Sequence, residues 1–538
     1  MTLRSGLVLL LSAVLVSGLA GQRGARKAAP AAAAPQPADS LNNIKFRNLG
    51  PSVGGGRVTA VAGISGQPNV YYVGAAAGGV WKTTDGGNSW EAIFADQPTA
   101  SIGAIALAPS NPNLVWVGTG EANIRNDIVN GRGVFFSPDA GKTWKFMGLP
   151  NAGQISRIVI DPHDPDIVFV AAIGHAWTPN PDRGVFRTAD GGKTWQKVLS
   201  VNDTTGASDL VMVPGNSRVL FAGMWQVVRH PWGLVSGGAG SGIYRSTDGG
   251  MTWDRLATGL PKGPWGRVAV AAGPTNPRHI YALVESKQGV LWDSQDQGDH
   301  WTRVSDNHAL ASRGFYFSLL HVSPVDDKRV FFSSYQLLES DDGGKTTRII
   351  DRPVHVDHHA LWIDPANPDR MVQGNDGGAY ATQDAGKSWT WFNNLPIEQF
   401  YMVAADNNVP YNLCGGLQDN NAWCGASSGP AASLNGSEWF TVTGGDGEYA
   451  VPAPSDSTIV YAESQNGSLQ RIDLHSGVTR AVRPYVPGVS DRAAAELDYR
   501  FNWTTPVEVS DWTSQTAFAS CSPSRARRSS ASGVSPQA

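Results

Sequence analysis

Thr83-Thr84-Asp85-Gly86-Gly87-Asn88-Ser89-Trp90 is the first of seven copies of one signature in this chain. Each copy begins with Ser or Thr, has Asp at its third position and Gly at its fifth, and six of the seven end in Trp. Successive Asp residues lie 54, 51, 58, 48, 46 and 42 positions apart. Repetition at this period predicts an architecture of units that pack only against their neighbours. The copies, which we call the repeated turns, are 83–90, 137–144, 188–195, 246–253, 294–301, 340–347 and 382–389.

Each repeated turn has the composition of a β-hairpin turn. Apolar and polar residues alternate before it, as in Val80-Trp-Lys-Thr83, and again after it, as in Ser89-Trp-Glu-Ala-Ile-Phe94. Gly supplies positive φ in such a turn, and the Asp carboxylate can accept hydrogen bonds from backbone N–H groups. A second turn, rich in Pro and Asn, precedes most copies, as in Ser110-Asn-Pro-Asn-Leu-Val-Trp-Val117. Each unit therefore has about four antiparallel strands, which predicts an all-β fold with a seven-bladed β-propeller over residues 41–395.

The composition indicates which partners the protein can bind, and the amino-terminal sequence indicates the cellular compartment. The net charge of the 538 residues is −4, which argues against a nucleic-acid partner. Arg4 and the apolar run from Gly6 to Ala20 predict a signal peptide over residues 1–20, with an uncleaved anchor as the alternative. Residues 21–40 are rich in Ala and Pro, which predicts a flexible spacer. We expect a secreted or periplasmic protein that has no membrane association after signal cleavage.

The repeat changes after residue 395. Phe400-Tyr-Met-Val-Ala-Ala-Asp406 starts a unit that has no repeated turn. We predict a partial second propeller of about two blades over residues 396–510 and an off-pattern tail over residues 511–538. Two blades cannot close a ring, so we expect a truncated or frame-shifted form of a two-propeller parent. Cys414 and Cys424 flank one polar loop, where they could form a disulfide or remain free thiols.

The repeated turn resembles the Asp-box, or BNR repeat, of sialidases, two-propeller xyloglucanases and sortilin-type receptors. Further stretches resemble a group of large secreted bacterial proteins named as glycosyl hydrolases, BNR-repeat proteins or sortilin amino-terminal-domain proteins. The resemblance to xyloglucanases implies a substrate cleft between two propellers, with one carboxylate from each. Sialidase activity is disfavoured, because Glu448 and Tyr449 are adjacent and would point to opposite faces of a strand. The further stretches include Gly118-Thr-Gly-Glu121-Ala-Asn123, Asp357-His-His-Ala-Leu-Trp362 and Gly444-Gly-Asp446-Gly447.

The metal candidates lie in the sequence His355-Val356-Asp357-His358-His359. Along a strand, His355, Asp357 and His359 would share one face. Such a set suits zinc or another divalent metal, which is the only cofactor that the sequence predicts. A hydrogen-bonded loop cluster is the alternative interpretation.

Carboxylates in loops are the catalytic candidates, because glycoside hydrolysis generally requires two of them. Loops rich in Gly and Asn expose such groups, although an Asx turn is the alternative role for each one. Aromatic, basic and other polar loop residues are candidates for ligand binding. The predicted catalytic residues are Asp357, Asp376, Asp419 and Asp446, and the predicted ligand-binding residues are Glu121, Arg125, His175, Trp177, Trp232 and His358.

Two classes of function remain open from the sequence, because a fold does not decide a function. The first is a glycosyl-hydrolase-like protein that acts on or binds a polysaccharide or glycan. The second is a non-catalytic, sortilin-like propeller that binds a peptide or protein partner. The first class predicts two convergent carboxylates in a polar groove, and the second class predicts a face without such a pair.

Overall fold

The computed structural model describes Leu49 and residues 54–429, 436–483, 499–510, 517–519 and 522–523. The chain forms two units, residues 1–48 and 49–538. The predicted signal peptide, the predicted spacer and most of the predicted tail lie outside the described residues. Among the described residues the helices are two short 3-10 turns, η2 (His308–Ala311) and η3 (Gly436–Glu438). The remaining elements are strands, which confirms the all-β prediction.

Seven antiparallel sheets follow one another between Val58 and Trp391, and each pairs its strands in chain order. The first two sheets hold β1 (Val58–Ile64), β2 (Gln67–Ala75), β3 (Val80–Thr83), β4 (Glu91–Ala92), β5 (Ile102–Ala108), β6 (Asn111–Thr119), β7 (Val134–Ser137) and β8 (Lys145–Phe146). The third holds β9 (Gln154–Ile160), β10 (Val168–Gly174), β11 (Gly184–Thr188) and β12 (Gln196–Leu199), and the fourth holds β13 (Thr205–Val213), β14 (Asn216–His230), β15 (Gly233–Ser236), β16 (Gly242–Ser246) and β17 (Asp254–Leu256). The fifth holds β18 (Val268–Ala272), β19 (Ile280–Val284), β20 (Leu291–Ser294) and β21 (Thr302–Ser305), and the sixth holds β22 (Leu319–Ser323), β23 (Asp326–Ser333), β24 (Leu337–Ser340) and β25 (Arg348–Ile349). The seventh holds β26 (His358–Asp364), β27 (Asn367–Asn375), β28 (Gly378–Thr382) and β29 (Thr390–Trp391).

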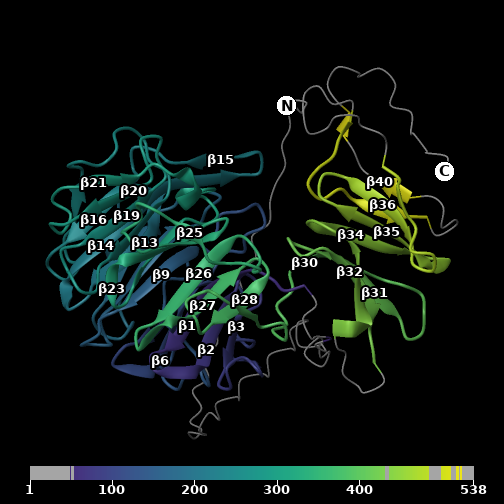
Figure 1. Cartoon of the computed structure of the whole chain (residues 1–538), viewed down its shortest axis with the longest axis horizontal. Helices are drawn as coiled ribbons and strands as arrows, with labels where there is room; N and C mark the ends of the chain where they lie inside the picture. The colour runs from purple at the N-terminus through teal and green to yellow at the C-terminus, as the bar shows by residue number, and fades with distance from the viewer. Residues whose placement is uncertain are drawn as a thin grey trace, which may run out of the picture. The chain divides into compact units, whose positions relative to one another are not determined.

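The first strands of these sheets form a closed ring. They contact one another in the order β1, β5, β9, β13, β18, β22 and β26, and β26 contacts β1. Figure 1 labels β1, β9, β13 and β26 of this ring. One buried core joins the two ends of the ring, because Val58 and Val73 pack with Val372 and Ala379. Sheets that radiate from a ring of inner strands form a β-propeller.

The repeated turns connect the third and fourth strands of the seven sheets. In the turn that follows β11, the Thr188 hydroxyl donates to Asp190 Oδ1 at 2.7 Å and accepts from the Gly192 N–H at 2.9 Å. The Asp190 carboxylate also accepts the Thr194 hydroxyl and the Thr194 N–H. These bonds from Thr194 lower the pKa of Asp190 to about 2. The Asp residues of the repeated turns are therefore structural.

The conserved Gly of the repeated turn lies against the preceding sheet. A Cβ on Gly192 would lie 2.6 Å from the ring of Trp116, which belongs to β6 of that sheet. A Cβ on Gly87 would lie 2.4 Å from Phe392, which follows β29, so the same contact closes the ring. The Trp195 indole N–H adds a hydrogen bond of 2.6 Å to the Met147 carbonyl of the preceding unit. Gly is required here because both positive φ and the close approach exclude a side chain.

Two further four-stranded sheets follow the ring. Cys414 and Cys424 lie opposite each other on β31 and β32 and are joined by a disulfide. Two short strand pairs, β38 with β41 and β39 with β40, come after these sheets. The strands are β30 (Phe400–Ala405), β31 (Asn412–Leu417), β32 (Ala422–Ala426), β33 (Trp439–Thr443), β34 (Gly447–Ala453), β35 (Asp456–Ser464), β36 (Ser468–Asp473), β37 (Thr479–Ala481), β38 (Tyr499–Arg500), β39 (Val507–Val509), β40 (Ala517–Ala519) and β41 (Ser522–Pro523).

The strand order separates the connections of each sheet into two groups. Antiparallel strands paired in chain order place the first and third turns at one end of the sheet. The repeated turns are third turns, so they lie at that end. The turns between second and third strands, and the links from one sheet to the next, lie at the opposite end. Most predicted site residues belong to these second turns and links, which places them away from the repeated turns.

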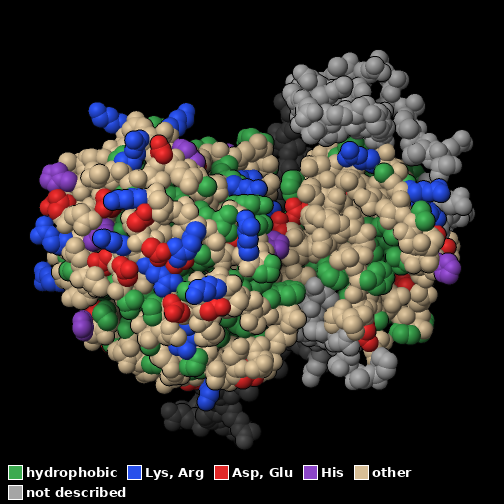
Figure 2. Space-filling model, in the orientation of Figure 1, with side chains coloured by type: hydrophobic (Ala, Val, Ile, Leu, Met, Phe, Trp, Pro, Cys, Tyr) green, Lys and Arg blue, Asp and Glu red, His purple; other side chains and the backbone are tan. Residues whose placement is uncertain are grey.

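Basic and acidic side chains are interspersed on the face of the molecule shown in Figure 2. This face therefore offers no extended surface of one sign, in agreement with the net charge of −4. A search of the described residues finds no helix with the length and apolar character needed to cross a membrane.

We predict that Gly192→Ala lowers the free energy of unfolding by about 2–4 kcal/mol, since it combines a strained positive φ with overpacking against Trp116. Gly215→Ala is the matched control, because Gly215 has φ +74 and no atom within 4 Å of the added Cβ. The control should lose only about 1 kcal/mol. Urea denaturation of both variants measures the difference, and equal losses would contradict the inter-sheet contact.

Candidate active site

A buried ion pair anchors the site at the end of the ring opposite the repeated turns. Arg57 directly precedes β1 and is 2 % exposed, and its Nε donates to Glu121 Oε2 at 2.9 Å. Glu121 follows β6 and is 1 % exposed. The pair therefore joins the first sheet to the second turn of the second sheet.

Tyr316 lies at the centre of the site, in the link between the fifth and sixth sheets. Its hydroxyl oxygen accepts hydrogen bonds from Arg57 Nη1 at 2.9 Å and from Arg125 Nη1 at 2.8 Å. Burial raises the pKa of Tyr316 well above its ordinary value, so the phenol keeps its proton. The hydroxyl donates that proton to Asp376 Oδ2. Tyr316 thus connects two guanidinium groups to one buried carboxylate.

Asp376 is held in its ionised form. It occupies the tight turn between β27 and β28 and is 1 % exposed. His359 Nε2 lies 2.8 Å from Asp376 Oδ1. Burial opposes ionisation, but His359 and Arg57 together hold the pKa of Asp376 below its ordinary value. Burial lowers the pKa of His359, so we assign it as a neutral imidazole that donates its Nε2 proton to the carboxylate.

Asp419 holds a proton beside this ionised carboxylate. It follows β31, and one of its oxygens lies within 4.8 Å of an oxygen of Asp376. Burial and the charge of Asp376 raise the pKa of Asp419, so the two groups share one proton between them. Gln418 Nε2 and Arg125 Nη1 donate to Asp419 Oδ2 at 2.9 and 3.3 Å. A neutral carboxylic acid and a carboxylate therefore lie side by side.

Of the paired acids, Asp419 lines a cleft of about 590 Å³, which Asp357 also lines. Burial and the charge of Asp376 raise the pKa of Asp357 to about 6, although Arg313, at 3.5 Å, works in the opposite direction. The lining combines acids with arginines and aromatic rings. The cleft is lined by Arg125, Asn126, Asp127, Arg229, Arg313, Phe315, Tyr316, Asp357, Tyr401, Asp419, Asp446, Gln465, Trp503 and Thr504.

The structure brings the four predicted catalytic carboxylates close together. Asp357, Asp376 and Asp419 form one cluster, and Asp446 Oδ1 accepts the Asp419 N–H at 2.5 Å. Asp376 and Asp357 come from the sheets of the ring, whereas Asp419 and Asp446 come from the sheets that follow it.

Of the six predicted ligand-binding residues, only Arg125 lines the cleft. Glu121 is buried beneath it in the ion pair with Arg57. His358 is fully buried, with its two ring nitrogens on Gln373 and Asp351, so it cannot reach a ligand. His175, Trp177 and Trp232 are absent from the cleft lining, and Trp232 is 84 % exposed on the hairpin of β14 and β15.

The alternation argument for the metal set is wrong, because residues 355–357 form a loop and β26 begins at His358. Asp357 has φ +64, which strand geometry does not allow. His355 Nε2 contacts the Asp419 carbonyl, and His359 Nε2 contacts Asp376, so the two imidazoles have different partners.

Another set of oxygens has the spacing of a cation site. Single carboxylate oxygens of Asp357, Asp376 and Asp419 lie within 4.8 Å of one another. Arg125 Nη1 already lies 3.9 Å from Asp376 and 3.3 Å from Asp419. Because this guanidinium supplies positive charge, we interpret the cluster as a proton-sharing set.

Sequence reasoning missed Arg57, Tyr316 and Gln418. Arg57 follows three Gly residues and Tyr316 lies in the aromatic run Phe315-Tyr316-Phe317, at positions where sheets are linked. An aromatic run in a link that should be polar was the available signal for Tyr316. Gln418 adjoins the predicted Asp419 in the sequence, and its side-chain amide donates to the Asp419 carboxylate.

No family model matches the chain. A xyloglucanase of Paenibacillus sp. is 24 % identical over 423 residues, which are 66 % of this chain and 40 % of that protein. A xyloglucanase of Acetivibrio thermocellus is 27 % identical over 242 residues, which are 41 % of this chain and 28 % of that protein. The chain therefore spans less than half the length of these curated relatives.

Solved structures of GH74 enzymes share the fold. The enzyme of Niastella koreensis has a TM-score of 0.58 and 16 % identity, and the match covers 88 % of this chain and 70 % of that one. An ancestral GH74 enzyme has a TM-score of 0.58 and 18 % identity, with 88 % and 67 % of the two chains covered. At these identities the likeness establishes the propeller fold.

We predict that Glu121→Gln lowers the free energy of unfolding by about 3 kcal/mol, because it removes the closest charged partner of the buried Arg57 and leaves Asp127 at 4.0 Å. Asp299→Asn is the control, since it breaks the half-exposed pair with Arg245 and should cost less than about 1 kcal/mol. Chemical denaturation measures both variants, and a loss at Glu121 no larger than that at Asp299 would contradict the assignment.

Proposed function

We propose that this chain is a glycoside hydrolase that cleaves a polysaccharide of the xyloglucan type in the cleft between the ring and the sheets that follow it. The observation that carries the proposal is a pair of cleft carboxyl groups, Asp419 and Asp357, whose surroundings favour different protonation states. Glycoside hydrolysis requires one acid and one base or nucleophile. The xyloglucanases among the relatives support the choice of substrate.

Asp419 is proposed as the general acid. It carries a proton because burial and Asp376 disfavour its ionised form. It would donate that proton to the glycosidic oxygen as the bond to the anomeric carbon breaks, which avoids an alkoxide leaving group. Gln418 and Arg125 fix its second oxygen, and Arg125 would stabilise the carboxylate that remains.

Asp357 is proposed as the second carboxyl group. With a pKa of about 6 it is largely ionised at neutral pH and can stabilise the positive charge that develops at the anomeric carbon. It would act either as the nucleophile or as the base that removes a proton from water. The anomeric configuration of the released sugar, followed by NMR, distinguishes these roles, because the first gives retention and the second gives inversion.

Aromatic groups in the cleft are proposed to hold the sugar chain. Phe315, Tyr401 and Trp503 line it, and the Trp503 side chain is 46 % exposed. Such rings bury apolar surface of a ligand, and polar groups between them fix its orientation. We place the activity outside the cytoplasm, as the amino-terminal sequence predicts. The cleft requires no metal in this proposal.

We predict that Asp419→Asn and Asp357→Asn each lower kcat on xyloglucan by about 100-fold or more. Both variants should still bind the polysaccharide, because the aromatic lining is unchanged. Asp254→Asn, an exposed residue of β17, is the control and should keep full activity. Release of reducing sugar measures kcat, and affinity electrophoresis measures binding. Binding without hydrolysis in the wild type would favour the non-catalytic alternative.

We predict a bell-shaped dependence of kcat/KM on pH. Activity should fall as the pH drops through about 6, because Asp357 then becomes protonated, and should fall above neutrality as Asp419 loses its proton. Arg313→Ala should move the acid limb to higher pH, because Arg313 lowers the pKa of Asp357. An acid limb that stays in place in this variant would remove Asp357 from its role.

A further inference from the structure

A buried arginine without an acidic partner lies inside the ring, separate from the lining of the cleft. Arg267 directly precedes β18 and is 3 % exposed. Its Nε has no hydrogen-bond partner, and its Nη1 lies 3.5 Å from the Gly314 carbonyl. No ion pair joins its guanidinium to a carboxylate of the described residues. A buried charge is normally paired, so this side chain requires an explanation.

Arg57 provides an internal comparison, because both arginines follow a Gly and directly precede the first strand of a sheet. Arg57 has the carboxylate of Glu121 against its Nε at 2.9 Å. The nearest equivalent acid for Arg267 would be Glu285, but Glu285 Oε2 accepts the backbone N–H of Arg267 and the Ser236 hydroxyl. At the two equivalent positions the neighbouring carboxylate thus differs: Glu121 contacts the guanidinium of Arg57, whereas Glu285 contacts only the backbone of Arg267.

Two acids, Asp209 and Glu285, act on the charge of Arg267, but neither forms an ion pair with its guanidinium. Arg157 of β9 donates from both Nε and Nη2 to Asp209 Oδ1 at 2.8 Å. Asp209 Oδ2 accepts the Val270 N–H, and the charge of Asp209 acts on Arg267 without an ion pair between the two side chains. Burial, followed by the charge of Arg157, lowers the pKa of His321 to about 3, so its imidazole is neutral. The nearby charges thus balance in number, but the Nε–H of Arg267 still has no acceptor.

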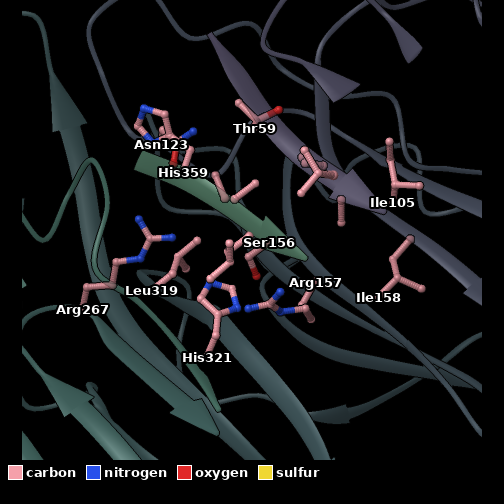
Figure 3. A pocket seen from close by; sticks show the side chains of 17 residues that line it. Thr59, Ile105, Asn123, Ser156, Arg157, Ile158, Arg267, Leu319, His321 and His359 are labelled. Atoms are coloured by element: carbon pink, nitrogen blue, oxygen red, sulfur yellow. The ribbon is translucent and has the colours of Figure 1, made fainter. Parts of the chain in front are cut away.

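A cavity adjoins these side chains. Its volume is about 70 Å³, far more than the ~10–15 Å³ needed to hold one water. Arg267, Arg157 and His321 line it, together with Ser156 and Asn123 (Figure 3). His321 Nε2 is also buried without a partner among the described residues, so it adds an unused polar atom to the lining.

A wider apolar cavity shares part of this lining. It has a volume of about 420 Å³ and contains Arg157 and His321, the same two residues that line the smaller cavity. The rest of its lining is largely aliphatic and includes Leu210, Met212 and Val322. A polar pocket that shares two lining residues with an apolar one suits a ligand with a charged head and a short apolar tail.

We propose that the interior of the ring is a binding site for a short-chain carboxylate, whose head pairs with Arg267 and whose tail extends past His321 into the apolar cavity. The guanidinium fork matches a carboxylate in shape and charge. The bound carboxylate would accept hydrogen bonds from the guanidinium of Arg267, as the carboxylate of Glu121 does from Arg57. The site is distinct from the acids of the cleft and does not rest on the proposed hydrolysis.

Calorimetric titration of the full chain with butyrate tests the proposal. Butylammonium, which is similar in size but has the opposite charge, is the control ligand. Ionic strength is kept constant with a bulky sulfonate that the smaller cavity cannot hold. We expect one butyrate to bind per chain, butylammonium not to bind, and affinity to rise by up to about fourfold per methylene from acetate to butyrate. Absence of butyrate binding, or equal binding of both probes, would overturn the proposal.

Two variants locate the site. Arg267→Met keeps the length of the side chain and should weaken butyrate binding by at least about tenfold. Arg245→Met, at a surface ion pair, should bind within twofold of the wild type. Asp419→Asn should also keep butyrate binding, which separates this site from the cleft. Unchanged butyrate affinity in a folded Arg267→Met variant would refute the assignment. If that variant does not fold, the comparison of butyrate with butylammonium on the wild-type protein still tests the proposal.

Discussion

The contact between each repeated turn and the sheet before it is the constraint on which the ring depends. Polar bonds within the turn fix its backbone, and the conserved Gly then lets that backbone lie directly on an aromatic or aliphatic side chain of the neighbouring sheet. The same contact, between Gly87 and Phe392, closes the ring. The chain links each sheet to the next, but the relative placement of the sheets follows from this packing and from the contacts between the inner strands.

The repeated turns hold the sheets together at one end of the ring. The turns and links at the opposite end carry the residues of the candidate site. Arg57, Tyr316 and Asp376 come from three different sheets, and they meet only because the inner strands converge on the ring. Their hydrogen bonds are buried, where a satisfied polar network is strongly directional. Arg125 links this network to Asp419, so one continuous set of charges connects the ring to the sheets that follow.

The sequence predicts the repeated turns well, because each is encoded within eight neighbouring residues and its bonds are local. The four carboxylates that the sequence predicts as catalytic lie close together in the structure, because loops rich in Gly and Asn mark turns at the end of the ring opposite the repeated turns. Their catalytic role stays a prediction. Arg57 and Tyr316 were missed because their contact joins positions 259 residues apart. The alternation expected for residues 355–359 failed because Asp357 adopts a left-handed backbone just before β26 begins.

The pairing of Asp376 with Asp419 has a consequence for how the two parts of the chain depend on each other. Each carboxyl group is supplied by a different part of the chain. His359 and Arg57 of the ring keep the pKa of Asp376 low, whereas the raised pKa of Asp419 depends on its burial and on the charge of Asp376 beside it. If the later sheets separated from the ring, Asp419 would regain water and titrate as an ordinary aspartic acid. Association of the ring with the later sheets is therefore expected to be accompanied by the uptake of a proton at Asp419.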